Sequence, residues 1–210
     1  MMLLRVFLTV GLSIWAALLP AQDLEPPEAG QYQIDLGHTR LLFRVSHLGF
    51  SNYTALFTDI SGDLAFDPAA PETMQVTARI RADSVETHYP DPALDFNAVL
   101  TGPEFLNAAE FPEITFASTA VVLTGAQTAT VTGDLTLHGV TKPVTLAVTY
   151  NGGWKDMPLD VGGRIGFSAT GAFNRSDFGV GFGVPAPGTT MGVSDRVEVI
   201  LEAEFVKPRP

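Results

Sequence analysis

Hydrophobic and polar residues alternate over most of the chain after residue 30. The clearest case is 131–138, where two sets of side chains take turns: Val131, Gly133, Leu135 and Leu137 on one face, and Thr132, Asp134, Thr136 and His138 on the other. A period of two places successive side chains on opposite sides of a β-strand. Similar runs occur at 41–45, 60–66, 74–80, 114–116, 144–150, 165–173 and 197–205. The pattern predicts about eight strands, each with one apolar face.

Short turns join most of these runs, which favours antiparallel pairing. One longer interruption lies between Pro90 and Pro112, where 93–100 and 103–109 have the composition of short helices. A large antiparallel sheet must close into a barrel or fold into a sandwich to remove its exposed edges. We therefore expect an all-β fold with a short helical insertion around 93–109.

The apolar faces favour a barrel over a solid sandwich, because they mix large rings with residues that have little or no side chain. The rings are Phe43, Phe57, Phe66, Phe116, Phe167, Phe173 and Phe205, and the small residues are Gly62, Gly133, Ala169 and Gly171. An eight-stranded barrel is the size that holds one small ligand. The alternation alone leaves open whether the rings line a hollow interior or fill a core.

The first 21 residues have the pattern of a secretory signal, and we expect them to be removed. Arg5 precedes an uncharged apolar run at 6–19, which is too short to cross a bilayer as a helix. An uncleaved anchor is the alternative. Residues 22–30 follow as a polar lead that we expect to be disordered, and residues 31–207 then form one domain.

Composition removes several classes of function. The chain has 12 Lys and Arg against 23 Asp and Glu, a net charge of −11, so we expect no nucleic-acid partner. It has no Cys, which excludes disulfides and thiol catalysis.

The histidines suggest neither a metal site nor an active site. His38 and His47 are nine residues apart and point to opposite faces of a regular strand, and His88 and His138 lie in separate turns. No nucleophile elbow or paired carboxylates are apparent. We expect no catalytic residues, no metal and no cofactor.

His47 shares a face with Phe43 and Val45 and should point inward near one end of the barrel. It is either a contact for a ligand head group or a core histidine bonded to a backbone carbonyl. Arg175 and Asp177 leave a similar choice between an ion pair that pins a loop and a clamp on a head group.

Seven short patterns resemble a known family in residue type and order. They are Tyr32-x-Ile34-Asp35-x-x-His38-x4-Phe43-x-Val45-x-His47, Gly62-x-Leu64-x-Phe66-Asp67 after Phe57, Ala82-Asp83-Ser84-Val85-x-Thr87, Phe111-Pro112-x-Ile114-Thr115-Phe116, Gly133-x-Leu135-Thr136-Leu137-His138-Gly139-Val140-Thr141, Arg175-Ser176-Asp177-Phe178-Gly179 and Val193-Ser194-Asp195-x-Val197. Each pattern is weak alone, but together they span residues 32–197. The chain resembles the YceI family of secreted, polyisoprenoid-binding, lipocalin-like barrels.

The resemblance implies an eight-stranded up-and-down barrel in the periplasm whose apolar channel holds the isoprenoid tail of a polyprenyl lipid or quinone. It implies transport, storage or sequestration of this cargo, with transient contact to a membrane or a membrane protein, by a monomer or homodimer. The expected channel residues are Phe43, Val45, Phe57, Phe66, Phe116, Leu135, Leu137, Leu146, Phe167, Phe173, Val199 and Leu201, with His47, Arg175 and Asp177 as head-group contacts. The alternatives are a small secreted enzyme using His47 and a structural barrel that presents an acidic surface to a protein partner.

Overall fold

The computed structural model describes residues 25–156 and 162–208. The expected signal at 1–21 and the first three residues of the lead lie outside the described residues. Among the helices that are described, none is long and apolar enough to span a membrane.

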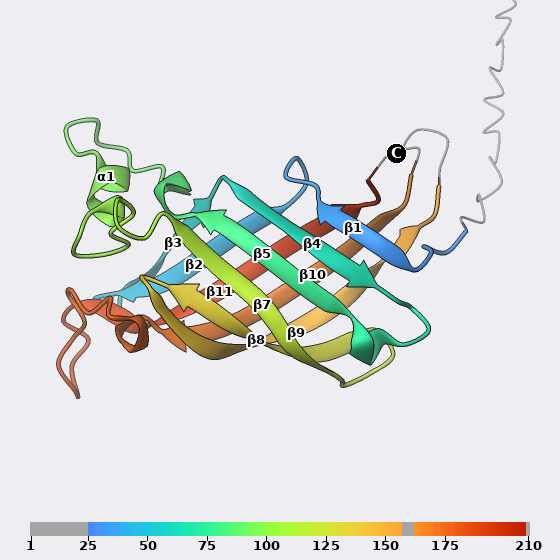
Figure 1. Cartoon of the computed structure of the whole chain (residues 1–210). Helices are drawn as coiled ribbons and strands as arrows, with labels where there is room; N and C mark the ends of the chain where they lie inside the picture. Colours follow the sequence, from blue (N-terminus) through green and yellow to red (C-terminus); the bar gives the residue numbers. More distant parts are fainter. Residues whose placement is uncertain (1–24, 157–161, 209–210) are drawn as a thin grey trace, which may run out of the picture.

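Strands dominate the described part of the chain, with a single short α-helix (Figure 1). The strands are β1 (Gly30–Ile34), β2 (Arg40–His47), β3 (Ser51–Phe57), β4 (Ile60–Phe66), β5 (Gln75–Arg81), β6 (Val85–Glu86), β7 (Glu113–Leu123), β8 (Thr128–Leu137), β9 (Val140–Trp154), β10 (Arg164–Asn174) and β11 (Val193–Val206). The helix is α1 (Phe96–Thr101), and 3-10 turns lie at Pro71–Thr73, Ala82–Ser84 and Arg175–Phe178.

The eleven strands make eight barrel strands, because three barrel strands are each interrupted once. The interrupted strands consist of β1 with β2, β3 with β4, and β5 with β6. β1 and β2 pair with β4 and β3 in what is nearly one continuous hairpin, and β5 and β6 pair with β4 and β3 in the same way. From β5 onward each long strand pairs with the next, and β11 returns to pair with both β2 and β1. The predicted eight-stranded antiparallel up-and-down barrel is confirmed, and each alternating run of the sequence belongs to a different barrel strand.

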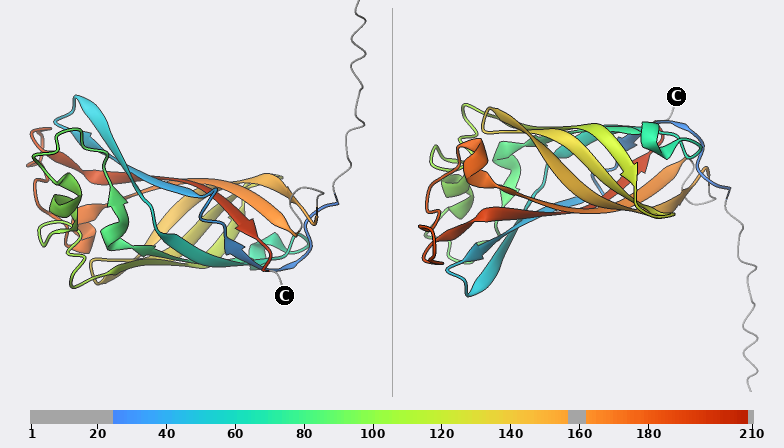
Figure 2. Two further views of the ribbon diagram at one scale, coloured as in Figure 1. Left: turned by 90° about the horizontal axis from the view of Figure 1, so that it is seen from above. Right: turned by 90° about the horizontal axis from the view of Figure 1, so that it is seen from below.

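The two ends of the barrel are built differently. One end, called here the α1 end, carries α1, the β2–β3 turn and the loop 179–192 (Figures 1 and 2). The opposite end carries the β7–β8 turn and both termini of the described chain. We call it the closed end, because a cluster of buried side chains fills the barrel there: Tyr32, Leu64, Phe66, Ile165, Ala203 and Phe205.

The glycines on the inner face let neighbouring side chains pack closely and do not leave empty space beside the rings. A Cβ at Gly133 would lie 2.3 Å from Cζ of Phe116, and one at Gly171 would lie 2.5 Å from Cδ2 of Leu146. Both distances are far below van der Waals contact. The space at each of these two glycines is therefore taken by its neighbour.

The helical insertion is shorter than the sequence suggested. Helix α1 begins after Asp95, whose carboxylate accepts a hydrogen bond from the Ala98 N–H at 2.9 Å and so caps the first turn. The second expected helix, at 103–109, consists of turns.

The described part of the lead, 25–30, packs on the barrel, which differs from the disordered segment expected. Pro27 is buried, and the Glu28 carboxylate pairs with Lys155 at 2.9 Å and with Lys207 at 3.3 Å. These contacts tie the chain before β1 to the closed end.

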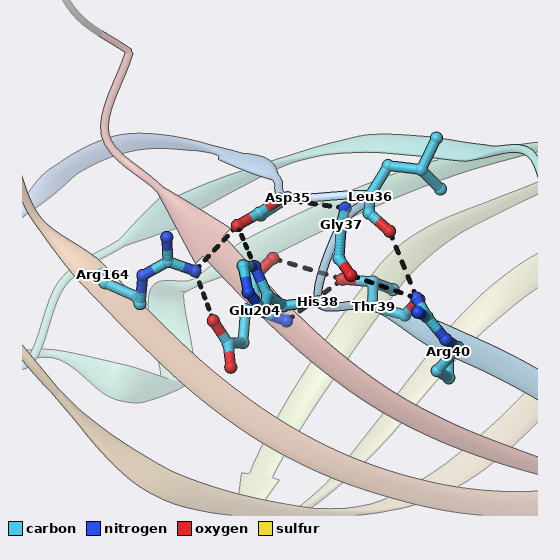
Figure 3. Close-up of polar contacts among 8 residues, drawn as sticks. All are labelled: Asp35, Leu36, Gly37, His38, Thr39, Arg40, Arg164 and Glu204. Atoms are coloured by element: carbon cyan, nitrogen blue, oxygen red, sulfur yellow. Dashed lines mark hydrogen bonds and ion pairs between the residues drawn. The ribbon is translucent and has the colours of Figure 1, made fainter. Parts of the chain in front are cut away.

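The loop 35–39, which separates β1 from β2, is fastened to β11 and β10 (Figure 3). The Asp35 N–H donates to the Glu204 carbonyl at 2.8 Å, and the Asp35 carboxylate accepts from His38 Nδ1 at 2.7 Å and from Arg164 at 2.8 Å. Arg164 also pairs with the Glu204 carboxylate. Since β1 and β11 share two residue pairs, this latch reinforces the place where the barrel closes.

Substitution Asp35→Asn should weaken the closure. Burial raises the pKa of the Asp35 carboxyl, but hydrogen bonds from His38, Arg164 and the Gly37 N–H outweigh it and hold the pKa below its usual value. A carboxyl whose pKa is lower in the folded state stabilises the fold fully at pH values above its unfolded-state pKa of about 4. This stabilisation is lost as the pH falls through the folded-state pKa. We expect Asp35→Asn to lower the free energy of unfolding by about 1–2 kcal/mol near neutral pH and by less near pH 3, measured by urea denaturation.

Asp134→Asn is the matched control, because this carboxylate is exposed and makes no hydrogen bond or ion pair with any described residue. Equal losses in the two variants, or a loss in Asp35→Asn that does not vary with pH, would contradict the latch.

Candidate functional site

A cavity of about 560 Å³ occupies the half of the barrel nearest the α1 end. Its walls come from inward-facing residues of β2, β3, β7, β8, β9, β10 and β11, with Ile60 and Ile80 from β4 and β5. The volume is in the range that binds one small ligand. The interior is thus hollow in one half and filled in the other. The alternation of the sequence left open whether the rings line a hollow interior or fill a core, and each alternative describes one half of the barrel.

Ten of the twelve residues expected along the channel line this cavity: Phe43, Val45, Phe57, Phe116, Leu135, Leu137, Leu146, Phe173, Val199 and Leu201. Phe66 and Phe167 do not. They pack at the closed end, where the Phe66 ring lies 6.3 Å from the Tyr150 ring and the Phe167 ring lies 6.1 Å from the Phe205 ring. The period of two predicted the correct face for both residues, but it carries no information on position along the barrel axis.

Sequence reasoning missed the residues that the segment 87–112 contributes to the cavity. These residues are Tyr89, Leu94, Phe96, Leu100, Phe105 and Leu106. They follow no strand period, and the signal that could have found them is the density of large apolar residues between Pro90 and Pro112. Asn97 holds the segment in place, because its carbonyl accepts from the Thr87 N–H at 2.9 Å and from the Thr87 hydroxyl at 2.6 Å.

Polar side chains reach the wall near the α1 end. Among the described residues they are His47, Tyr53, Tyr89 and Arg175, and the rest of the wall is aliphatic or phenylalanine. The cavity is therefore apolar almost throughout, and its few polar side chains lie at the α1 end.

His47 ends β2 and lies exposed at this opening. Its exposure excludes the core-histidine interpretation. Its ring forms no hydrogen bond or ion pair with any described residue, so both nitrogens remain available to a ligand.

Arg175 is buried, and it organises the loop that follows β10. Its guanidinium donates to four backbone carbonyls, at distances of 2.7–3.1 Å: those of Val180, Phe182, Val193 and Ser194. Burial lowers the pKa of Arg175, and the nearby Asp195 raises it in part. The group stays charged because arginine is protonated throughout the accessible pH range. It therefore places a positive charge at the wall of an otherwise apolar cavity.

Asp177 does not join Arg175, so of the two alternatives left open for this pair, the ion pair between them is wrong. The Asp177 side chain is exposed, lies 3.7 Å from Lys142 and does not line the cavity. Arg175 does pin the loop, but it does so through carbonyl groups. The two residues fall in a 3-10 turn, where the alternation of an extended strand does not apply.

The latch at 35–39 also brings together groups that can hold a cation. One ligand atom each from Asp35, His38 and Glu204 lies within 4.8 Å of the others. Arg164 already bonds to both carboxylates and balances one of their two negative charges within the latch (Figure 3).

Comparison with curated proteins finds relatives that match nearly the whole chain. The UPF0312 protein of Pseudomonas putida (strain W619) is 37% identical over 201 residues, covering 95% of this chain and 96% of that protein. The UPF0312 protein of Pseudomonas savastanoi pv. phaseolicola is 39% identical over 187 residues, covering 88% and 91%.

Solved structures share the fold. Burkholderia cenocepacia BcnA matches with a TM-score of 0.68 at 23% identity, covering 81% of this chain and 98% of that chain. The YceI protein of Campylobacter jejuni matches with a TM-score of 0.65 at 27% identity, covering 78% of this chain and 90% of that chain. A polyisoprenoid binding domain from Saccharophagus degradans matches with a TM-score of 0.56 at 15% identity, covering 84% of this chain and 98% of that chain.

The model of the YceI-like domain matches residues 32–205. This range begins in β1 and ends one residue before β11 does, so it includes nearly all of the barrel and every residue that lines the cavity. The chain belongs to the family of YceI-like domains.

Proposed function

We propose that this protein binds one isoprenoid-tailed lipid, a polyprenyl lipid or a quinone, with the tail inside the cavity and the head group at the α1 end. The observation that carries the proposal is the apolar cavity, which stops at the filled closed end and whose few polar side chains lie at the α1 end. An apolar tail fits its depth, and a polar head group fits beside those side chains. The fold shared with the polyisoprenoid binding domain of Saccharophagus degradans supports the choice of tail.

The tail supplies most of the affinity in this proposal. Each buried CH₂ contributes about 0.8 kcal/mol, so a few isoprene units give strong binding without any directional contact. The filled closed end limits how far the tail can enter. The cavity therefore selects ligands by width and length more than by detailed chemistry.

The head group is recognised at the opening. The free ring nitrogens of His47 can donate to or accept from a quinone carbonyl or a phosphate oxygen. The charge of Arg175 favours an oxygen-bearing head beside it, although most of its N–H groups already bind the loop carbonyls.

The protein is proposed to work in the periplasm after removal of residues 1–21, and to transport, store or sequester its cargo there. This part rests on the signal pattern of the sequence. Loading requires transient contact with a membrane or a membrane protein, by a monomer or homodimer. The cargo is the only small molecule that the proposal needs, with no catalytic cofactor.

Two other functions compete with this one. A small secreted enzyme would use His47, and its rate of turnover would show a bell-shaped dependence on pH. The substitution His47→Ala would abolish that turnover. A structural barrel with an acidic surface would need no interior space. The apolar cavity favours lipid binding over both.

The direct test is to purify the protein from its native compartment, extract it with organic solvent and identify the extract by mass spectrometry. The expected result is a prenyl lipid or quinone in near-stoichiometric amount. A protein that carries none and also fails to bind added ubiquinone would contradict the proposal.

Substitution Leu146→Asp should abolish ligand binding, because it places a carboxylate in the apolar wall of the cavity. Ala147→Asp is the matched control. Ala147 is the next residue of β9, faces solvent and pairs with Thr130 and Thr170, so no acidic neighbour opposes the new charge. We expect the control to bind like the wild type in fluorescence titrations with a labelled polyprenyl lipid, once circular dichroism shows both variants folded. Equal binding by the two folded variants would rule out the cavity as the site.

Substitution His47→Ala should reduce the affinity for a quinone by about tenfold or less, the value of one hydrogen bond, and leave the affinity for the tail hydrocarbon unchanged. His88→Ala is the control, because His88 is exposed and lies outside the cavity wall. Isothermal titration with quinone and with the hydrocarbon measures both affinities. A parallel loss for the two ligands would show that His47 does not contact the head.

A further inference from the structure

Three large apolar side chains are exposed at the tips of two turns at the α1 end. Phe50, in the β2–β3 turn, is 86% exposed, and Met191 and Phe182, in the loop 179–192, are 73% and 52% exposed. We call these three residues the apolar rim. Exposed apolar side chains that gather at one place on a soluble protein commonly mark an interaction site.

The two turns that carry the rim are fastened together. The Leu48 N–H donates to the Gly192 carbonyl at 2.8 Å, and the Gly49 backbone packs against the Thr190 side chain. The three views in Figures 1 and 2 all show the β2–β3 turn and the loop 179–192 at the same end of the barrel. These contacts hold the two turns side by side at the opening of the cavity.

The rim is continuous with the wall of the cavity. The Phe182 ring lies 5.4 Å from the Phe105 ring in a T-shaped contact, and Phe105 lines the cavity. Arg175 fixes the position of Phe182 by donating to its carbonyl at 2.7 Å. An apolar path therefore leads from the tips of the turns to the interior of the barrel.

Charge is absent from both rim segments and negative beside them. Residues 48–58 and 180–194 contain no Asp, Glu, Lys, Arg or His, in a chain of net charge −11. The segment 87–112, at the same end, carries four carboxylates and no Lys or Arg: Asp91, Asp95, Glu104 and Glu110. An anionic surface would be repelled by these carboxylates, whereas a surface without net charge meets no such barrier at the uncharged rim.

We propose that the apolar rim inserts into the surface of a zwitterionic bilayer and so places the opening of the cavity at the level of the lipid head groups. This inference rests on the proposed function, because the ligand is then a component of that bilayer. Side chains on separate turn tips enter a fluid interface easily, whereas a protein partner would need a matching surface for each tip. An isoprenoid tail could then pass between bilayer and cavity without crossing water.

The test compares wild-type protein with the double variant Phe50→Ser/Met191→Ser in flotation with phosphatidylcholine vesicles. Both side chains are exposed, so the variant should fold normally. We expect wild-type protein to float with the vesicles and the variant to bind at least about tenfold more weakly, because two apolar side chains no longer enter the interface. Adding phosphatidylglycerol should weaken wild-type binding, most at low salt.

Val122→Ser/Leu123→Ser is the matched control, because these exposed apolar residues end β7 at the closed end of the barrel. It should bind vesicles like the wild type. Equal vesicle binding by the rim variant and the control would overturn the inference. So would a difference in oligomeric state between wild-type protein and the rim variant without lipid, since the rim would then join two copies of the chain.

A second measurement separates this inference from the proposed function. Binding of a polyprenyl lipid supplied in detergent should be the same in wild-type protein and in the rim variant, while transfer of that lipid from vesicles should be slower in the variant. If wild-type protein binds vesicles but does not bind the lipid in detergent, the proposed function is contradicted and the insertion of the rim into a bilayer is still supported. Normal transfer from vesicles by a rim variant that no longer binds them would overturn the role given to the rim.

Discussion

The structure depends on the return of β11 to the first barrel strand. That pairing turns a long antiparallel sheet into a closed surface and gives it an inside, and without it the apolar faces would have no common interior. The chain has no cysteine, so closure relies on backbone pairing and on side-chain contacts. The loop 35–39 interrupts this pairing where β1 passes to β2, and the ion pairs of Arg164 with Asp35 and Glu204 lie at that interruption.

Closure alone does not make a cavity; the distribution of side-chain volume along the barrel axis does. At the closed end the Phe66 ring of β4 meets the Tyr150 ring of β9 across the barrel, and Tyr32 and Phe205 pack in the same cluster. Toward the α1 end the wall is equally apolar, but its side chains leave about 560 Å³ unfilled. Because backbone pairing holds the wall at a fixed radius, the interior cannot collapse onto this space without breaking strands. The cavity therefore ends at the packed side chains of the closed end, and its fixed depth suits a ligand whose apolar tail has a matching length.

The sequence was sufficient to predict the strands, because alternation depends on local geometry that every barrel strand shares. It was also sufficient to predict which residues face inward. It was not sufficient to place Phe66 and Phe167 at the closed end, because depth depends on the register of paired strands and on where each strand is broken. The segment 87–112 was missed as cavity wall for a related reason, since its apolar side chains act from turns and a short helix with no common period.

Arg175 shows a different limit. The nearby Asp177 suggested an ion pair, but Arg175 donates to four backbone carbonyls, two in the loop 179–192 and two at the start of β11. Burying a charge is costly unless its hydrogen bonds are nearly complete, and a curled loop is one of the few places where several carbonyls converge on one guanidinium. The residue was recognisable in the sequence, but its partners are backbone atoms and leave no side-chain signature.

The distribution of charge explains how an acidic protein can expose an apolar rim. The net charge of −11 lies outside the segments 48–58 and 180–194, so two copies of the chain repel each other at long range while the rim itself remains uncharged. A large like charge opposes self-association, which an exposed Phe50 and Met191 would otherwise promote. Repulsion between copies falls off within about 8 Å at physiological salt, so it acts on approach and costs nothing once the rim meets a neutral surface. The same charge that keeps the barrels apart therefore leaves the rim free to contact uncharged apolar material, and the opening of the cavity lies beside it.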